Sequence, residues 1–409
     1  MTRHWILPAT LLISLLVTPF RVNGAGLTVS SLPGDPAQPG FVCHSGTGAF
    51  GPCLLDPALQ VNRMVWVGTD GTGDYVSIQA ALDDIPSWCG TPGLFNQCLV
   101  QLGPGVHDVG ATSLQMVDYV SIHGAGIETT IIKGSNSGTT GGVVNLASAD
   151  LESLTVRNVS SASGSHVVVF ASSGSPNLRE VGIRCQNSYT CYGIYNNGAY
   201  FLTLERVEIV SSSSINDTTD DAYGIYNVSG DFVDIIDSSI SVSDAADRRY
   251  GLRNNGQTTV NVRNTEIIIG PQTGSAPGSW HMGIYNFNSD LKLVAVDINM
   301  LGGSGVGKVE GLHHGSSGGN DSAKIYRSTI FIGNAIGEYA VHFSGTGTYE
   351  ISNSRISSMG TSTGANAPSV TVVNSTISSG VLAGDSTKHY CGSVYKTFPL
   401  VLLDSDCQP

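Results

Sequence analysis

Short runs of alternating apolar and polar residues fill the chain from about residue 142 onward, and two kinds of run take turns. The first kind is a five-residue run, YGIYN at 192–196 and again at 223–227. The second kind is LTL at 202–204, followed by VEI at 207–209. Alternation with a period of two residues is typical of β-strands, and none of these runs has helical spacing. The pattern therefore predicts a succession of short strands.

The spacing between equivalent runs indicates how these strands are arranged. The shortest step between equivalent apolar residues leads from Ile351 to Val372, and the longer steps add a variable extra length to it. A constant unit of roughly 21 residues with such additions is typical of a solenoid whose coils carry inserted loops. One connection between runs keeps nearly the same length, whereas the other is long from 209 to 223 and short from 330 to 339, so insertions are expected along one edge. The equivalent residues are Leu204, Ile235, Val262, Leu293, Ile325, Ile351 and Val372.

Stacked coils would bury the central residue of each five-residue run in one interior column. Alternation would turn both neighbours of that residue outward, which gives a shallow trough of glycines beside a wall of larger side chains. The expected interior column is Ile194, Ile225, Leu252, Ile284, Leu312 and Val341. The expected glycine column is Gly193, Gly224, Gly251, Gly283 and Gly311, ending in Ala340. The expected wall is Tyr195, Tyr226, Arg253, Tyr285, His313 and His342.

Asparagine or aspartate recurs where the chain must bend between strands, and these residues tolerate a left-handed backbone. These bend residues are Asp237, Asn264, Asn353 and Asn374. Together the patterns predict an all-β fold, a single-stranded parallel β-helix of about ten coils, over residues 65–390. A tandem array of β-sandwiches is the alternative fold, but it would need a hairpin turn at every strand end and a longer repeat.

One amphipathic helix is expected near residues 77–85, ahead of the first complete coil. It would cover the open apolar end of the solenoid and block end-to-end pairing. The cysteine-bracketed tail over 391–409 is expected to cap the other end. The signals for the helix are Ile78, Ala81, Leu82 and Ile85 on one face, Ser77 as the N-cap and Pro86 after the end.

Composition and the first residues indicate where the protein works. Only 12% of the residues are charged and the formal charge is −13, which argues against a nucleic-acid partner. Residues 1–24 have the positive start, apolar stretch and small residues of a secretory signal peptide. No other segment is long and apolar enough for a membrane helix, so no membrane partner is expected. We expect a secreted or periplasmic protein with an N-terminal extension over 25–64, in an oligomeric state that the sequence leaves open.

Eight cysteines fall as four pairs that are close in sequence. An even count in an exported chain favours disulfides over free thiols, and local pairing is the simplest connectivity. A metal site is the competing interpretation, although no C-x-x-C or histidine-rich spacing supports it. The expected pairs are Cys43 with Cys53, Cys89 with Cys98, Cys185 with Cys191, and Cys391 with Cys407.

The region that precedes the repeats carries a recognisable set of segments. They are VWVGTDGTGDY at 65–75, SIQAAL at 77–82, VQLGPGVH at 100–107, VSIHGAG at 120–126 and TTII at 129–132. Together these segments resemble the opening of the pectin-lyase-like right-handed parallel β-helices, most of all the pectinesterase branch. The resemblance implies a right-handed β-helix. Esterases, lyases and non-catalytic proteins share this opening, so it implies no particular reaction.

The catalytic signatures of these enzymes are absent from the sequence. The pectinesterase segments Gln-Asp-Thr-Leu, Asp-Phe-Ile-Phe-Gly and Arg-Pro-Trp do not occur. TDDA at 219–222 and IHG at 122–124 are only fragments of the polygalacturonase set. No catalytic residue is therefore transferred from either class.

The expected wall of side chains is the first candidate site. Aromatic rings with polar tips suit sugars, which are apolar on one face and hydroxylated at the edge, so Tyr195, Tyr226, Arg253, Tyr285, His313 and His342 are expected to bind substrate. A purely structural ladder is the alternative interpretation of the same residues.

Acidic residues in two equivalent loops form the second candidate. Close carboxylates suit Ca²⁺, and the resemblance implies such an ion because uronate lyases of this fold use one to bridge the substrate carboxylate. Arg248, Arg249 or Arg253 would then move or steer a proton, with Lys308 more distant. Paired carboxylates could instead hydrolyse a glycoside, or they could simply be solvated. The residues are Asp217, Asp220 and Asp221, then Asp244 and Asp247 one coil later.

A third cluster holds His281, His313, His314 and His342, for which proton transfer or metal binding competes with stacking, the favoured interpretation. The sequence thus predicts an exported β-helix that binds an acidic polysaccharide along its looped face. If it is an enzyme, a polysaccharide lyase or glycoside hydrolase is expected. A non-catalytic glycan-binding, adhesion or structural module is the alternative.

Overall fold

The computed structural model divides the chain into two compact units, Met1–Asn62 and Arg63–Pro409. In the first unit the described strands form two antiparallel pairs, β1 (Arg21–Val22) with β2 (Ala25–Gly26) and β3 (Val42–His44) with β4 (Phe50–Pro52). The residues described in the second unit are 63–186, 189–213, 220–245, 247–256, 258–270, 279–301, 308–317, 321–333, 339–345, 347–361, 369–380, 390–392, 394–397 and 400–403.

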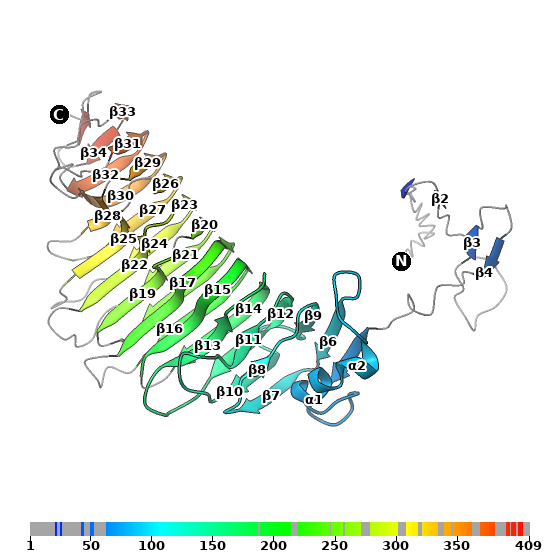
Figure 1. Cartoon of the computed structure of the whole chain (residues 1–409). Helices are drawn as coiled ribbons and strands as arrows, with labels where there is room; N and C mark the ends of the chain where they lie inside the picture. The colour runs from blue at the N-terminus through cyan, green and yellow to red at the C-terminus, as the bar shows by residue number, and fades with distance from the viewer. Residues whose placement is uncertain are drawn as a thin grey trace, which may run out of the picture. The chain divides into compact units, whose positions relative to one another are not determined.

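The second unit is a parallel β-helix in which each coil contributes a strand to each of three sheets (Figure 1). Several long strands bend at a corner and serve two sheets. The first sheet contains β5 (Met64–Val67), β6 (Cys98–Leu102), β9 (Val120–His123), β12 (Asp150–Asn158), β14 (Asn177–Gln186), β15 (Cys191–Glu205), β17 (Asp221–Ile236), β20 (Thr259–Arg263), β23 (Leu291–Val294), β26 (Ser322–Tyr326), β29 (Thr348–Ser352), β31 (Ser369–Val373) and β33 (Tyr390–Gly392).

The other two sheets follow the same order along the chain. The second sheet contains β7 (Gly105–Gly110), β10 (Thr130–Gly134), parts of β12 and β14, β16 (Glu208–Ser212), β18 (Ser239–Ser243), β21 (Glu266–Ile269), β24 (Asp297–Met300), β27 (Thr329–Ile332), β30 (Arg355–Thr361), β32 (Thr376–Gly380) and β34 (Val394–Thr397). The third sheet contains β8 (Leu114–Gln115), β11 (Val144–Leu146), β13 (His166–Ala171), parts of β15 and β17, β19 (Arg248–Asn254), β22 (Trp280–Phe287), β25 (Lys308–Ser316), β28 (Tyr339–Gly345) and the end of β30.

This architecture is a parallel β-helix, so the predicted fold class is confirmed. About eight coils are regular, slightly fewer than the ten expected, and further strands extend each sheet at the two ends. The difference arises at the ends, because β5 is followed by helices instead of a complete coil. At the other end β34 pairs antiparallel with β35 (Leu400–Leu403).

The register of the first sheet confirms the predicted spacing at every step. Leu204 pairs with Ile235, and the same alignment continues coil by coil to Val372. All of the equivalent apolar side chains are buried. The residue spacing therefore reports the length of each coil directly.

The interior column of the third sheet is also confirmed, but the glycines beside it point the other way from the prediction. Ile194 pairs with Ile225, and the column continues to Val341 with every member fully buried. A Cβ atom on Gly193 would lie 2.6 Å from Cγ2 of the buried Ile209, so the glycine faces the inside. The glycine breaks the period-2 alternation, and the predicted shallow trough does not exist.

The predicted bend residues adopt the left-handed backbone. Asp237, Asn264, Asn353 and Asn374 have φ of 50°, 47°, 51° and 47°. Other residue types take the same conformation at other bends, for example Ala295 at 55°. The corner therefore imposes the conformation, and asparagine is the residue that adopts it at least cost.

A ladder of buried asparagines runs inside the corner between the third and first sheets. The side-chain amide of Asn196 donates to Oδ1 of Asn227, and Asn227 and Asn254 donate to the next asparagine in turn, each over 2.6 Å. The last amide, Asn286, lies 2.9 Å from Nδ1 of His314. Every one of these side chains is fully buried, so the ladder satisfies polar groups that would otherwise lack a partner.

Two short helices close the N-terminal end of the β-helix. Helix α1 (Ile78–Asp83) begins at Ser77, whose hydroxyl accepts from the backbone N–H of Ala80. Its buried residues join the apolar interior beside β5 to β8. Pro86, expected to follow the helix, instead lies in the first turn of helix α2 (Ile85–Trp88), where a missing backbone N–H costs nothing.

Two of the four predicted disulfides, Cys89–Cys98 and Cys185–Cys191, are formed, with Cα–Cα distances of 6.1 and 5.9 Å. The side chains of the other two predicted pairs lie outside the described residues, as do most of residues 1–24. Among the helices that the structure describes, none is long and apolar enough to cross a membrane.

Candidate functional site

The outer surface of the third sheet carries three columns of side chains, and we call this surface the ladder face. Its strands pair in register from β13 to β28, so equivalent side chains lie directly over one another. The loop-side column is Asp221, Arg248, Trp280 and Lys308. The middle column is Tyr192, Tyr223, Tyr250, Met282, Glu310 and Tyr339. The far column is Phe170 followed by the predicted wall, Tyr195, Tyr226, Arg253, Tyr285, His313 and His342.

The longer connections begin and end beside the ladder face. Those between β16 and β17, β18 and β19, β21 and β22, β24 and β25, and β27 and β28 all join the second sheet to the third. Because the strands on either side are stacked, these connections begin and end along one edge, as the sequence spacing predicted. The loop-side column therefore lies at the edge where connections of variable length begin and end.

The middle column is a packed ladder and was missed by the sequence reasoning. Tyr223 is stacked between Tyr192 and Tyr250, with ring centres 4.7 and 5.3 Å away, and it is 2% exposed. Both faces of its ring are occupied by protein. These tyrosines therefore stabilise the sheet, which is the structural interpretation that the sequence left open for the far column.

Arg253 in the far column is enclosed by aromatic rings. Its guanidinium carbon lies 4.9 Å from the ring centre of Tyr226 and 5.2 Å from that of Tyr250. Tyr223 and Tyr285 are each 5.9 Å away. These contacts are cation–π interactions, which hold a charged group in place without neutralising it. Burial opposes the charge, but the surrounding tyrosine hydroxyl groups raise the pKa of Arg253, so it remains a cation.

A hydrogen-bond chain links Arg253 to one of the predicted acids. Nη1 of Arg253 donates to the hydroxyl of Tyr223 over 3.2 Å, and this hydroxyl donates to Oδ2 of Asp221 over 2.6 Å. Burial raises the pKa of the Asp221 carboxyl. Burial and the Asp221 charge both raise the pKa of Tyr223. The tyrosine is thus held protonated, which is the opposite of what a catalytic base requires.

The remaining acids of the predicted cluster lie in different environments. Asp247 lies 3.4 Å from Arg248, and its backbone N–H donates to the carbonyl oxygen of Asp220, which is buried directly before β17. Asp244 is exposed in a bend with φ of 55°, and Asp217 lies outside the described residues. Among the described residues, these carboxylates form no group of three ligand atoms that could hold an ion, so the Ca²⁺ expectation gains no support here.

The four predicted histidines occupy three different environments. His313 and His342 lie in the far column, each with Nδ1 beside the buried carboxylate of Glu310. Burial works against the charge of Glu310, but the hydrogen bonds from the two histidines lower its pKa to about 2. His314 continues the asparagine ladder, and burial lowers its pKa to about 4. His281 points into the core beside Arg249.

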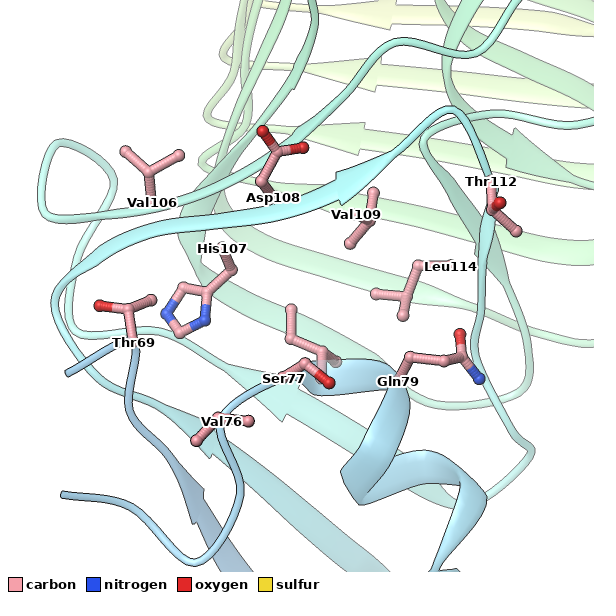
Figure 2. A pocket seen from close by; sticks show the side chains of 11 residues that line it. Thr69, Val76, Ser77, Gln79, Val106, His107, Asp108, Val109, Thr112 and Leu114 are labelled. Carbon is pink, nitrogen blue, oxygen red and sulfur yellow. The ribbon is translucent and has the colours of Figure 1, made fainter. Parts of the chain in front are cut away.

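A pocket of about 570 Å³ lies at the opposite end of the β-helix, between helix α1 and strands β7 and β8 (Figure 2). It is lined by parts of the segments that carry the resemblance, including Ser77, His107 and Asp108. Nε2 of His107 lies 3.0 Å from the carbonyl oxygen of Gly103, and Asp108 pairs with Lys133 over 2.7 Å. None of the predicted site residues lines this pocket. Nδ1 of His107 is buried there without a hydrogen-bond partner among the described residues.

Comparisons with known proteins give structural likenesses only. No protein family matches the sequence, and a search of characterised sequences also finds no match. Pectin methylesterase from carrot aligns over 72% of this chain and 82% of its own, with 14% identity and a TM-score of 0.40. The A-module of mannuronan C-5 epimerase AlgE4 from Azotobacter vinelandii aligns over 78% and 89%, with 14% identity and a TM-score of 0.36. Tailspike protein 2 of the Escherichia coli O157:H7 bacteriophage CAB120 aligns over 87% and 45%, with 13% identity and a TM-score of 0.43. The fold of the chain itself is established by its strand pairing.

Proposed function

We propose that the ladder face binds an acidic polysaccharide outside the cell and that Arg253 is the anchor for its carboxylate groups. The observation that carries the proposal is the environment of this one side chain. Four tyrosine rings fix the guanidinium, while only Nη1 and Nε have hydrogen-bond partners among the described residues. Nη2 is left to donate to a ligand, and a guanidinium fork matches a carboxylate in geometry and charge.

The neighbours of Arg253 extend a surface of the same character. Arg248 and Lys308 add positive charge in the loop-side column, and both lie over the exposed ring of Trp280. Tyr195, Tyr226 and Tyr285 are half-buried, so they offer hydroxyl groups and ring edges to a ligand. Hydroxyl donors and cations together suit a sugar acid better than a neutral, apolar ligand.

Binding is favoured over cleavage by the chemistry of the described residues. Tyr223 is buried and held protonated, and Asp221 already accepts its hydrogen bond. Neither group is poised to take a proton from a substrate. We therefore favour a glycan-binding role over the lyase and hydrolase roles. The signal-like residues 1–24 and the two disulfides support an extracellular location.

Calorimetric titration with polygalacturonate, alginate and a neutral glucan tests this proposal. The two acidic polymers are expected to bind, more weakly as salt is added, and the glucan is not. Arg253→Met keeps the apolar volume in the aromatic cage and should weaken binding about 10-fold or more. Arg263→Met is the matched control, because Arg263 pairs with Asp234 on the first sheet. Equal binding by Arg253→Met and the wild type, or equal binding of the glucan, would overturn the proposal.

A further inference from the structure

The middle and far columns change character at one place on the ladder face. Through four coils they hold tyrosine, methionine and arginine, but at β25 and β28 they hold Glu310, His313 and His342. Glu310 and His313 come from one coil, and His342 from the next. The direct pairing of His313 with His342 brings all three side chains together.

The ligand atoms of these three residues converge. Nδ1 of His313 lies 2.8 Å from Oε2 of Glu310, and Nδ1 of His342 lies 2.6 Å from Oε1. One nitrogen or oxygen from each residue lies within 4.8 Å of the other two. The ligand atoms of four-coordinate Zn²⁺ lie about 3.3 Å apart. This value falls between the 2.6 Å of the shortest pair and the 4.8 Å that bounds the set, so small side-chain shifts make room for such an ion. Among the described residues, no other set of three histidine, cysteine or acidic side chains is gathered in this way.

The surroundings of the cluster hold the ligands in position but leave one side open. The side chain of Glu310 is 2% exposed, and the ring of His313 is stacked on Tyr285 with centres 5.3 Å apart. The side chain of His342 is 20% exposed, so water or another small ligand can reach the cluster. Rigid ligands with one accessible position are the arrangement of an open metal site rather than a closed structural one.

We propose that Glu310, His313 and His342 bind a divalent transition-metal ion of the Zn²⁺ class. Two imidazoles and one carboxylate are a ligand set that such ions accept. The proposal is independent of the glycan-binding role of Arg253. Lys308 opposes the ion, because its ammonium group lies 3.3 Å from Oε1 of Glu310. The same ammonium group also lies over the ring of Trp280, and it can keep this cation–π contact when the ion is bound.

The test is a Co²⁺ titration of the full chain, freed of any affinity tag and treated with a chelator, followed by visible absorption and equilibrium dialysis. We expect one equivalent of Co²⁺ with a visible band, displaced by Zn²⁺, at a Kd on the order of 1 μM or below. His313→Phe and His342→Phe should weaken binding about 100-fold or more. Phenylalanine suits the column, since Phe170 already stands in it. Lys308→Met should tighten binding about threefold or more.

Matched variants distinguish this site from general binding to histidine. His123→Phe removes a histidine that lies 3.5 Å from Glu152 on the first sheet, and it should leave Co²⁺ binding unchanged. His342→Gln serves as a second probe if a phenylalanine variant has an altered circular dichroism spectrum or unfolding midpoint. The absence of bound Co²⁺ in the wild type would overturn the proposal. Equal binding by the wild type and a folded His342 variant would also overturn it.

Discussion

Gly251 and Ile267 face each other across the inside of the β-helix, so that a Cβ atom on the glycine would lie 2.5 Å from Cγ2 of the isoleucine. The same Cβ atom would lie 2.5 Å from the backbone oxygen of Gly283 in the next coil. The glycine column therefore serves close packing between the third and second sheets, and it contributes nothing to the ladder face.

Gly251→Ala is expected to lower the free energy of unfolding by about 3 kcal/mol, because the added methyl group meets atoms that cannot move away easily. Gly93→Ala is the control, since no atom lies within 4 Å of the Cβ position there. Urea unfolding monitored by circular dichroism measures the free energy of unfolding of both variants. An unchanged midpoint for Gly251→Ala would mean that the glycine column faces outward after all.

Substitutions at two equivalent left-handed bends should change the stability of the protein in opposite directions. Ala295→Asn should stabilise the protein by about 0.5–1 kcal/mol, because asparagine adopts positive φ at lower cost than alanine. Asn264→Ala should destabilise it by about 1 kcal/mol or more, since it also removes the hydrogen bond to Asp237. Lys324→Asn, on the exposed side of β26, is the control. Thermal unfolding measures the stability of the three variants. A higher unfolding midpoint for Asn264→Ala than for the wild type would refute the left-handed conformation assigned to this corner.

The asparagine ladder should be sensitive to the loss of a single member. Asn254→Ala leaves the amide of Asn227 without its 2.6 Å acceptor and Oδ1 of Asn286 without its donor. Both groups are buried, so we expect a loss of about 2–4 kcal/mol in the free energy of unfolding. Asn255→Ala changes the next residue, which is exposed, and should cost less than about 0.5 kcal/mol. Comparable losses for the two variants would show that the ladder is not a stabilising element.

His281 makes stability depend on pH in a defined direction. Burial, helped by the nearby Arg249 guanidinium, lowers its pKa from 6.5 to about 3. Between these values the unfolded state binds a proton that the folded state does not, so this histidine costs about 1.4 kcal/mol for each pH unit below 6.5. His281→Val, which introduces the residue type of Val309 one coil later, should flatten the loss of stability between pH 6.5 and pH 4. Denaturant unfolding at several pH values measures the slope, and equal slopes would contradict this account.

Those features of the fold that depend on one physical rule alone are predictable from the sequence. The distance from Leu204 to Ile235 is the length of one coil, so apolar spacing predicts strand register without any knowledge of side-chain packing. The left-handed bends at Asp237 and Asn264 follow from residue type in the same way. The fold and its interior columns were therefore accessible from the sequence.

The ladder face was predicted only in part because glycine breaks the alternation. Gly193 and Ile194 both face inward, so Tyr192 and Tyr195 lie on the outer surface on either side of them, which a strict period of two does not allow. The middle column, and Glu310 with it, was missed for this reason. The sequence does contain a signal for the middle column, since the first residue of each five-residue run is usually tyrosine. The neighbours of Glu310 become visible only when the coils are stacked.

A crystal structure of the protein with a bound oligogalacturonate would show which surface holds the glycan. We expect the sugar on the outer surface of the third sheet, with a carboxylate oxygen within about 3 Å of the Arg253 guanidinium. An oligosaccharide bound to the first or second sheet, or in the pocket beside His107, with Arg253 left uncontacted, would contradict it.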